Sequence, residues 1–306
     1  MKKVIAIAAL LGLAGAAQAQ VTVYGLVDAG YSKVDNAEGK ISYSNNSTTR
    51  VGLKGETDLG SGYKGSFNLE AGGIEGDKGG KAFFDRQAWV GLSSGFGEIR
   101  FGTQDSAAFK ALIGFDANGA ANDTMAAQSA VVPVLGQNSL AGKELVNYIS
   151  PSMGGLQVTV GVTPKGDRNL VADPQAKTNA SFTLTYAGGP VAAAAVVESA
   201  NSDAAGASSY SAFAASYDLG VVKLAAVVAN GGTNAKGYNL AVSAPLAGAT
   251  VGVQYANNTD TKNTGTEFFV NKEVLKNTTA YFEYGTQNID KGAKTNMYSV
   301  GLIYVF

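Results

Sequence analysis

The 306-residue sequence contains no cysteine and no histidine, and each absence narrows what the protein does. Without cysteine there is no disulfide and no thiol chemistry, which suits a chain that must avoid mispairing in an oxidising compartment. Without histidine the chain lacks the commonest general base and metal ligand. No motif singles out a carboxylate, hydroxyl or amine for catalysis. We therefore expect no enzyme, no cofactor and no metal site.

The sequence also lacks a long apolar run. A transmembrane helix needs roughly 20 consecutive apolar residues, and the apolar stretch 4–14 is too short for one. A basic head precedes this stretch, and Ala17-Gln18-Ala19 follows it as a small-residue cleavage signature. The pattern predicts a signal peptide, residues 1–19, cut between Ala19 and Gln20. The remaining residues, 20–306, are expected to form a single exported domain that enters a membrane only through strands.

Proline is scarce, with six residues, whereas glycine (40), tyrosine (14) and phenylalanine (13) are abundant. The net charge is −1 and the mean hydropathy is +0.04. A hydropathy near zero is expected if each strand is apolar on one face only. This composition indicates a turn-rich and aromatic-rich β protein, and we expect no nucleic-acid partner.

The last residues, 298–306, alternate along their whole length and end on an aromatic side chain. Tyr304 and Phe306 share one face with the other large apolar residues of this segment. A period of two indicates a strand, because successive side chains point to opposite sides of a pleated chain. A terminal strand avoids an exposed edge by pairing with the first strand, which closes a barrel.

The same alternation recurs through most of the chain. Sixteen strands are predicted, within residues 21–31, 49–56, 63–71, 86–92, 98–102, 146–150, 156–162, 180–186, 191–197, 211–217, 222–228, 238–244, 251–255, 268–272, 280–284 and 298–306. Short turns alternate with long polar connections, which is typical of a membrane β-barrel and not of a β-sandwich. Four basic residues are predicted on the inward, polar face: Arg50, Lys54, Arg86 and Arg100.

The longest connection, residues 104–143, shows almost no period of two. It contains three acidic residues, Asp105, Asp116 and Asp123, whose spacing fits no EF-hand loop. A structureless stretch of this length in a compact domain is usually functional or disordered. If this connection folds into the barrel, its acids oppose the basic inward face and predict a transverse electric field.

Several segments in order along the chain resemble the Gram-negative outer-membrane porins, and most closely those of beta-proteobacteria. They are Val21-Thr-Val-Tyr-Gly25, Thr57-Asp-Leu-Gly-Ser-Gly62, Arg86-Gln-Ala-Trp-Val-Gly-Leu92, Asn147-Tyr-Ile-Ser-Pro151 and the terminal 301–306. The resemblance implies an all-β, 16-stranded antiparallel transmembrane barrel in outer-membrane lipid, assembled as a homotrimer. It implies that a third loop, here 104–143, folds inward as the constriction.

The resemblance further implies that Arg50 and Arg86 are pore-wall residues facing that loop. Tyr304 and Phe306 would be the signal that the barrel-assembly machinery reads. The implied function is passive diffusion of ions and small hydrophilic solutes. A structural or adhesive barrel without an open pore is the alternative. Sixteen strands enclose an interior too wide for side chains alone to fill, and one loop narrows such a lumen without blocking it, which favours transport.

Overall fold

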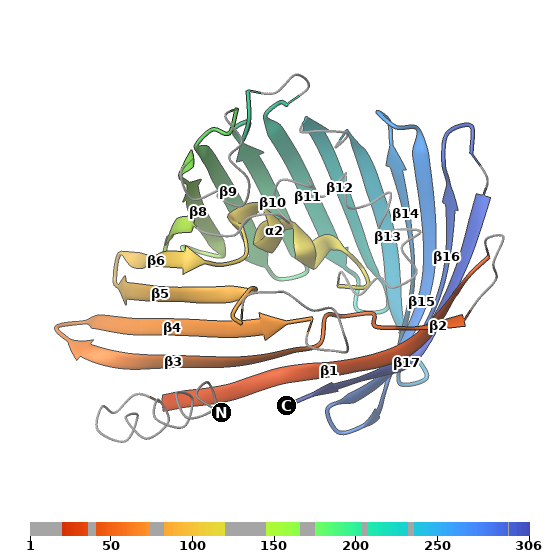
Figure 1. Ribbon diagram of the computed structural model, residues 1–306, viewed down its shortest axis with the longest axis horizontal. Helices are drawn as coiled ribbons and strands as arrows, with labels where there is room; N and C mark the ends of the chain where they lie inside the picture. Colours follow the sequence, from red (N-terminus) through yellow and green to blue (C-terminus); the bar gives the residue numbers. More distant parts are fainter. Residues whose placement is uncertain are drawn as a thin grey trace.

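The computed structural model describes residues 20–35, 41–73, 83–119, 145–165, 175–203, 207–231, 236–292 and 294–306 (Figure 1). The wall begins with β1 (Gln20–Val34), β2 (Ile41–Ser44), β3 (Arg50–Gly60), β4 (Tyr63–Gly72), β5 (Gln87–Ser94) and β6 (Gly97–Thr103). The helix α2 (Ala107–Leu112) and the 3₁₀ helix η1 (Ile113–Phe115) follow. The wall continues with β7 (Leu145–Ile149), β8 (Leu156–Thr163), β9 (Asn179–Gly188), β10 (Val191–Glu198), β11 (Tyr210–Asp218) and β12 (Lys223–Gly231). It ends with β13 (Gly237–Leu246), β14 (Ala249–Asn258), β15 (Asn263–Leu275), β16 (Thr278–Asn288) and β17 (Lys294–Val305).

Every strand pairs antiparallel with its neighbours, and the pairing of β1 with β17 closes the sheet. Val27 lies opposite Tyr304 in this seam. At its end, Gly25 and Phe306 exchange two backbone hydrogen bonds of 3.0 Å each. The predicted closing strand is therefore confirmed, with the last residue of the chain inside the ladder.

The short strand β2 does not add a seventeenth strand to the barrel wall. It pairs with residues 30–33 of β1, whereas β3 pairs with residues 20–26 of the same strand. β2 and β3 therefore occupy one strand position in the barrel wall, and this strand is interrupted between residues 45 and 49. The buried Asp28 bridges this interruption, because its carboxylate accepts from the Ser47 N–H and its N–H donates to Thr49 Oγ1 at 3.0 Å. The predicted barrel of 16 antiparallel strands is confirmed.

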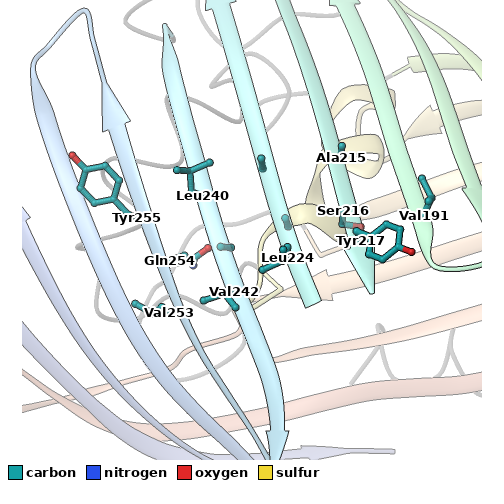
Figure 2. Close-up of a pocket in the computed structure, with 13 residues that line it drawn as sticks. Val191, Ala215, Ser216, Tyr217, Leu224, Leu240, Val242, Val253, Gln254 and Tyr255 are labelled. Carbon is teal, nitrogen blue, oxygen red and sulfur yellow. The ribbon is translucent and has the colours of Figure 1, made fainter. Parts of the chain in front are cut away.

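Side chains alternate between an outer, apolar surface and an inner surface, as the strand pattern predicts. In β9, Phe182 and Leu184 are exposed on the outside, while Ser181 and Thr183 are buried inside. The outer face also holds a shallow apolar hollow of about 670 Å³ across β10–β14, lined by side chains that include Leu240 and Val253 (Figure 2). No helix among the described residues is long and apolar enough to span a membrane.

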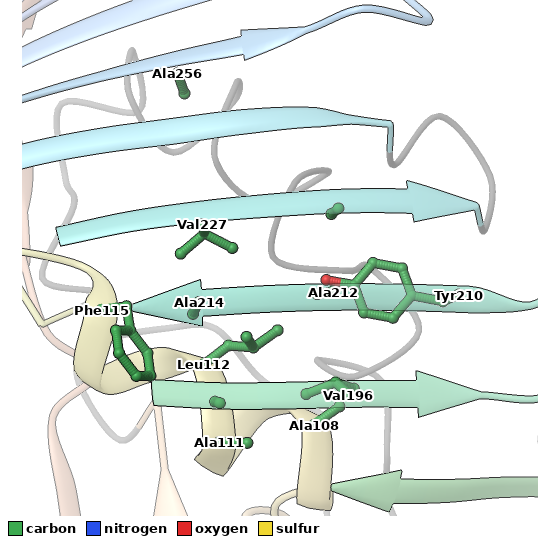
Figure 3. Packing of buried hydrophobic residues seen from close by; sticks show 12 residues of the cluster. Ala108, Ala111, Leu112, Phe115, Val196, Tyr210, Ala212, Ala214, Val227 and Ala256 are labelled. Carbon is green, nitrogen blue, oxygen red and sulfur yellow. The ribbon is translucent and has the colours of Figure 1, made fainter. Parts of the chain in front are cut away.

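The hydrophobic core lies inside the barrel and not between sheets. Leu112 and Phe115, from α2 and η1, pack with inward-facing residues of the wall such as Val196, Tyr210 and Val227 (Figure 3). α2 contacts β8, β9 and β10, and η1 contacts β11 and β12. This part of the long connection therefore lies against the inner wall.

The alternation of faces generates a prediction about insertion into lipid. We expect Leu184→Arg to lower folding into liposomes, because a charge on the lipid-facing surface near the bilayer centre costs ~2–4 kcal/mol. The neighbouring Thr185 lines a polar space inside the barrel, so Thr185→Arg is the matched control. Denaturant titration of both variants in liposomes measures the difference. Equal loss of folding in the two variants would contradict the assigned faces.

The seam generates a second prediction. A Cβ at Gly25 would lie 2.4 Å from the Arg50 carbonyl oxygen and 2.6 Å from the Phe306 ring. We therefore expect Gly25→Ala to lower the yield of folded barrel, because overpacking costs about 1–3 kcal/mol. Gly95→Ala is the control, since nothing lies within 4 Å of a Cβ there. Deleting Phe306 should act like Gly25→Ala. Heat-modified mobility on gels reports the folded fraction, and wild-type yield of both variants would refute the role of this contact.

Candidate functional site

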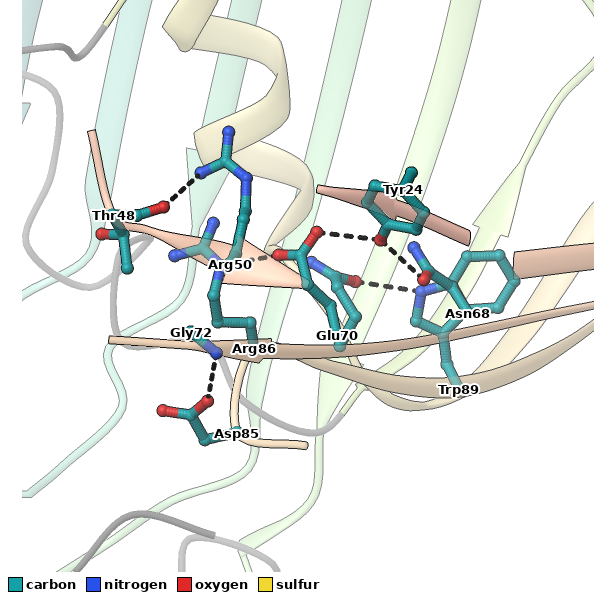
Figure 4. Close-up of polar contacts among 10 residues, drawn as sticks. Tyr24, Thr48, Arg50, Asn68, Glu70, Gly72, Asp85, Arg86 and Trp89 are labelled. Carbon is teal, nitrogen blue, oxygen red and sulfur yellow. Dashed lines mark hydrogen bonds and ion pairs between the residues drawn. The ribbon is translucent and has the colours of Figure 1, made fainter. Parts of the chain in front are cut away.

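The inner face of β1, β3 and β4 holds a network of polar side chains (Figure 4). The Tyr24 hydroxyl lies 2.8 Å from both Asn68 Oδ1 and Glu70 Oε2, either of which can accept its proton. Gly52 lies beneath the Tyr24 ring, where a Cβ would come within 2.5 Å of it. The Lys54 ammonium stands over the same ring, 5.1 Å from its centre. Lys54 therefore faces the lumen, as its position in the strand predicts.

Arg86 reaches the lumen although it lies just before β5. On β5 the inward residues are Gln87 and Trp89, so strand alternation alone would turn Arg86 outward. Its side chain instead crosses Gly72, where a Cβ would lie 2.0 Å from Arg86 Cδ. Its Nε then forms a 2.6 Å ion pair with the buried carboxylate of Glu70. Glycine at position 72 is what makes this path available.

Arg50 lies beside Arg86 but is held differently. Its guanidinium donates one long hydrogen bond, 3.5 Å, to the Thr48 carbonyl oxygen. No salt bridge joins it to another residue of the described chain. Both arginines line a cavity of about 310 Å³, together with Glu70, Asp105 and Lys110. Three basic and two acidic side chains therefore share this part of the lumen.

Arg100 lies further along the same wall, on β6. Its guanidinium forms a 2.6 Å ion pair with Glu98 and stands 4.2 Å from the ring centre of Trp89. Trp89 Nε1–H donates to Gln87 Oε1 at 2.9 Å. The inward position of Trp89 was not anticipated from the sequence, because an aromatic residue in an alternating strand is expected on the apolar face. The pairing of β4 with β5 shows that Trp89 faces the lumen, because it lies opposite the inward-facing Asn68.

Lys110 of α2 is a lumen residue that the sequence analysis missed. It is the only basic side chain between positions 104 and 119, and this was the signal available. Burial lowers the pKa of the Lys110 ammonium; the carboxylate of Asp105 opposes this effect and Arg100 adds to it. The inward connection therefore contributes positive as well as negative charge to the lumen.

The three predicted acidic residues of the connection do not lie together. Asp105 lines the cavity of Arg50 and Arg86. Asp116 is buried against β14, where its Oδ1 accepts from Gln254 Nε2 at 3.1 Å. Asp123 lies outside the described residues. Within the described ranges, no group of three or more carboxylates is arranged to hold a metal ion.

The polar spaces of the lumen adjoin one another. A second cavity of about 360 Å³ lies between α2 and β6–β9, and a third of about 800 Å³ lies near the β3–β4 turn. The second and third cavities share the lining residues Glu98 and Arg100. Trp89 lines both the third cavity and the cavity of Arg50, and Lys110 lines both the second cavity and the cavity of Arg50. Adjoining polar cavities therefore line the described inner wall from β1 to β9.

Comparison with known proteins places this barrel in a family. A family model described as Gram-negative porin matches residues 6–304. Outer membrane porin protein 32 of Delftia acidovorans is 30% identical over 289 residues, covering 84% of this chain and 80% of that protein. An outer membrane porin protein of Bordetella pertussis is 34% identical over 294 residues, covering 80% of this chain and 74% of that protein.

Solved structures show the same fold. The anion-selective porin from Comamonas acidovorans superposes with a TM-score of 0.77 at 23% identity, covering 94% of this chain and all of that one. OmpF of Salmonella typhi, in complex with daunomycin, superposes with a TM-score of 0.69 at 17% identity, covering 94% and 97%. The chain therefore belongs to the Gram-negative porin family, as a non-enzymatic channel for passive diffusion across the outer membrane.

Proposed function

We propose that the channel is narrowest where Arg50, Arg86 and Lys110 meet, and that this constriction favours small anions. The observation that carries the proposal is the charge of the cavity there, with three basic and two acidic side chains. One of the acids, Glu70, is neutralised by its ion pair with Arg86. Arg50 is therefore the charge most available to a passing ion.

The physical basis is the low dielectric of the surroundings. A fixed charge in a narrow passage between protein walls acts more strongly on an ion than the same charge in bulk water. The porin from Comamonas acidovorans is described as anion-selective, which supports the same direction for this chain. The predicted transverse field runs between Arg50 and Asp105, with Lys110 reducing the acidic character of the loop side.

The described start of the connection, Gln104 to Gly119, supports residues 104–143 as the constriction loop. Its apolar residues are held by the inner wall, which leaves Asp105 and Lys110 facing the arginines. A loop in this position narrows the lumen and leaves a polar path beside it. An open channel is therefore favoured over an adhesive barrel with a plugged lumen.

The assembled form is also part of the proposal. Residues 1–19 act as the export signal, and the mature chain begins at Gln20. The barrel-assembly machinery recognises Tyr304 and Phe306, which stack with ring centres 6.2 Å apart at the exposed end of β17. Three barrels then associate as a homotrimer. Intact mass of the purified protein tests the first statement, and cross-linking of membrane fractions tests the trimer.

Selectivity provides the functional test. We expect Arg50→Gln combined with Arg86→Gln to shift the reversal potential towards cations in a salt gradient, because Glu70 and Asp105 then dominate the cavity. Single-channel conductance should rise, since two long side chains are shortened. Planar bilayer recordings of purified protein measure both quantities.

Lys64→Gln is the matched control. Lys64 is a basic residue on the inner face of β4, but it is exposed, is paired with Glu56 at 2.7 Å and does not line the cavity of Arg50 and Arg86. Its neutralisation should move the reversal potential far less. Wild-type reversal potential and conductance in the double variant would show that these arginines do not line the narrowest point.

A further inference from the structure

Arg100 is held in a fixed direction, yet one of its hydrogen-bond donors has no partner. Its Nη2 forms the ion pair with Glu98, and its guanidinium stands over the Trp89 ring. Gly91 lies opposite Arg100 on β5, and a Cβ there would come within 2.7 Å of Glu98 Oε1. Glycine therefore leaves room for this arrangement. Arg100 Nε is buried, and it finds no acceptor among the described residues.

Asn147 of β7 lies opposite Arg100 across the β6–β7 pairing and is 3% exposed. Its Oδ1 is buried and accepts no hydrogen bond from the described part of the chain. Gly161 of β8 lies opposite Asn147, and a Cβ there would lie 2.7 Å from this oxygen. Buried polar groups normally have a hydrogen-bond partner, because an unpaired one loses its hydration without compensation. Two neighbouring strands therefore present one donor and one acceptor that await a partner.

Both side chains line the second cavity, of about 360 Å³, between α2 and the wall. On the helix side, the small side chains of Ala107 and Ala111 leave this space open. On the wall side, Thr159 of β8 and Thr183 of β9 lie opposite each other. Their hydroxyls donate as well as accept hydrogen bonds. The cavity therefore combines the size of a small-molecule site with a lining of hydrogen-bonding groups.

The two buried atoms discriminate between classes of solute. Arg100 Nε–H requires an acceptor, whereas Asn147 Oδ1 requires a donor. A carboxylate only accepts and an ammonium group only donates, but a molecule with several hydroxyl groups does both. An amino acid also offers both, but its two full charges lose more hydration in a lining where neutral hydroxyls and amides outnumber charged side chains. The chemistry therefore favours a neutral, polyhydroxylated solute.

We propose that this cavity, which we call the Arg100–Asn147 site, binds small neutral solutes that carry several hydroxyl groups, the class of glycerol and the monosaccharides. Lys110 lines both this cavity and that of Arg50, so the site adjoins the proposed constriction. The inference goes beyond that constriction, because an uncharged solute does not respond to the charge at Arg50. Binding at this site gives a diffusion channel a preference among neutral solutes.

The only tryptophan of the chain reports on the site. Because Trp89 stacks on Arg100, we expect its fluorescence in detergent-solubilised protein to change with added D-glucose and to reach saturation. Asn147→Leu keeps the approximate size of the side chain but removes Oδ1. It should raise the half-saturating glucose concentration about tenfold, the loss that one hydrogen bond gives. The measurement needs no ion current, so its failure is distinct from failure of the proposed constriction.

Asn239→Leu is the matched control. Asn239 of β13 is another buried asparagine whose Oδ1 has no partner in the described chain, but it does not line this cavity. Half-saturation should therefore stay at the wild-type value. Ala107→Leu covers the case in which Asn147→Leu does not fold. It fills the cavity from α2, removes no polar group and should abolish the glucose response.

Other probes define the class of solute. Glycerol should act like D-glucose at higher concentrations, since it is smaller and makes fewer hydrogen bonds. Acetate and glycine should give no saturable change that depends on Asn147. The proposal would be overturned by an absence of saturation with glucose, which means that the cavity holds water only. Wild-type half-saturation in Asn147→Leu, or an Asn147-dependent response to acetate or glycine, would overturn it as well.

Discussion

The pairing of β1 with β17 is the constraint on which the rest of the structure depends. In a membrane, every backbone N–H and C=O must find a partner within the protein, and a sheet achieves this only when it has no edge. The seam reaches the last residue, since Gly25 and Phe306 still exchange backbone hydrogen bonds. Once the sheet is closed, alternate side chains necessarily point outward or into the lumen. The apolar exterior and polar passage both follow from this geometry.

The lumen is divided unequally by the segment that enters it. Residues 107–115 contact the inner wall from β8 to β12. The inward side chains of β10 to β12 there are apolar, such as Ala194, Val196 and Val227, whereas those of β8 and β9 include Thr159 and Thr183. Arg50, Arg86 and Arg100 lie on the part of the wall that runs from β1 to β6. The cavity beside Arg50 and Arg86 therefore carries charge from the wall and, through Asp105 and Lys110, from the connection.

Charges in the lumen are mostly compensated by neighbours on the same wall. Arg86 pairs with Glu70, and Arg100 pairs with Glu98. The sequence pattern suggested a basic wall opposed to an acidic loop, whereas the folded chain has ion pairs along the wall and a lysine on the loop. Such pairs hold long side chains in fixed directions, which defines the cross-section of the passage as well as its electrostatics.

The barrel architecture could be predicted from the sequence, because a period of two is a local property of each strand. The alternation of apolar and polar residues predicted the 16 strands of the wall, the outward face of Leu184 and the closing role of residues 298–306. The pattern was weakest at 191–197 and 268–272, and the structure explains the first of these. Ala194 and Val196 face the lumen but pack beneath α2, so both faces of β10 are apolar and the alternation disappears.

The contacts inside the barrel, in contrast, could be found only from the folded chain. Arg86 reaches the lumen because Gly72, on the neighbouring strand, leaves room for its side chain. Asp116, predicted to face the arginines, binds Gln254 on β14 instead, and Asn118 binds strands whose sequence lies about half the chain away. These contacts depend on the path of a loop that has no periodic pattern. Local alternation therefore specifies the wall, but the contents of the lumen depend on long-range packing that it does not encode.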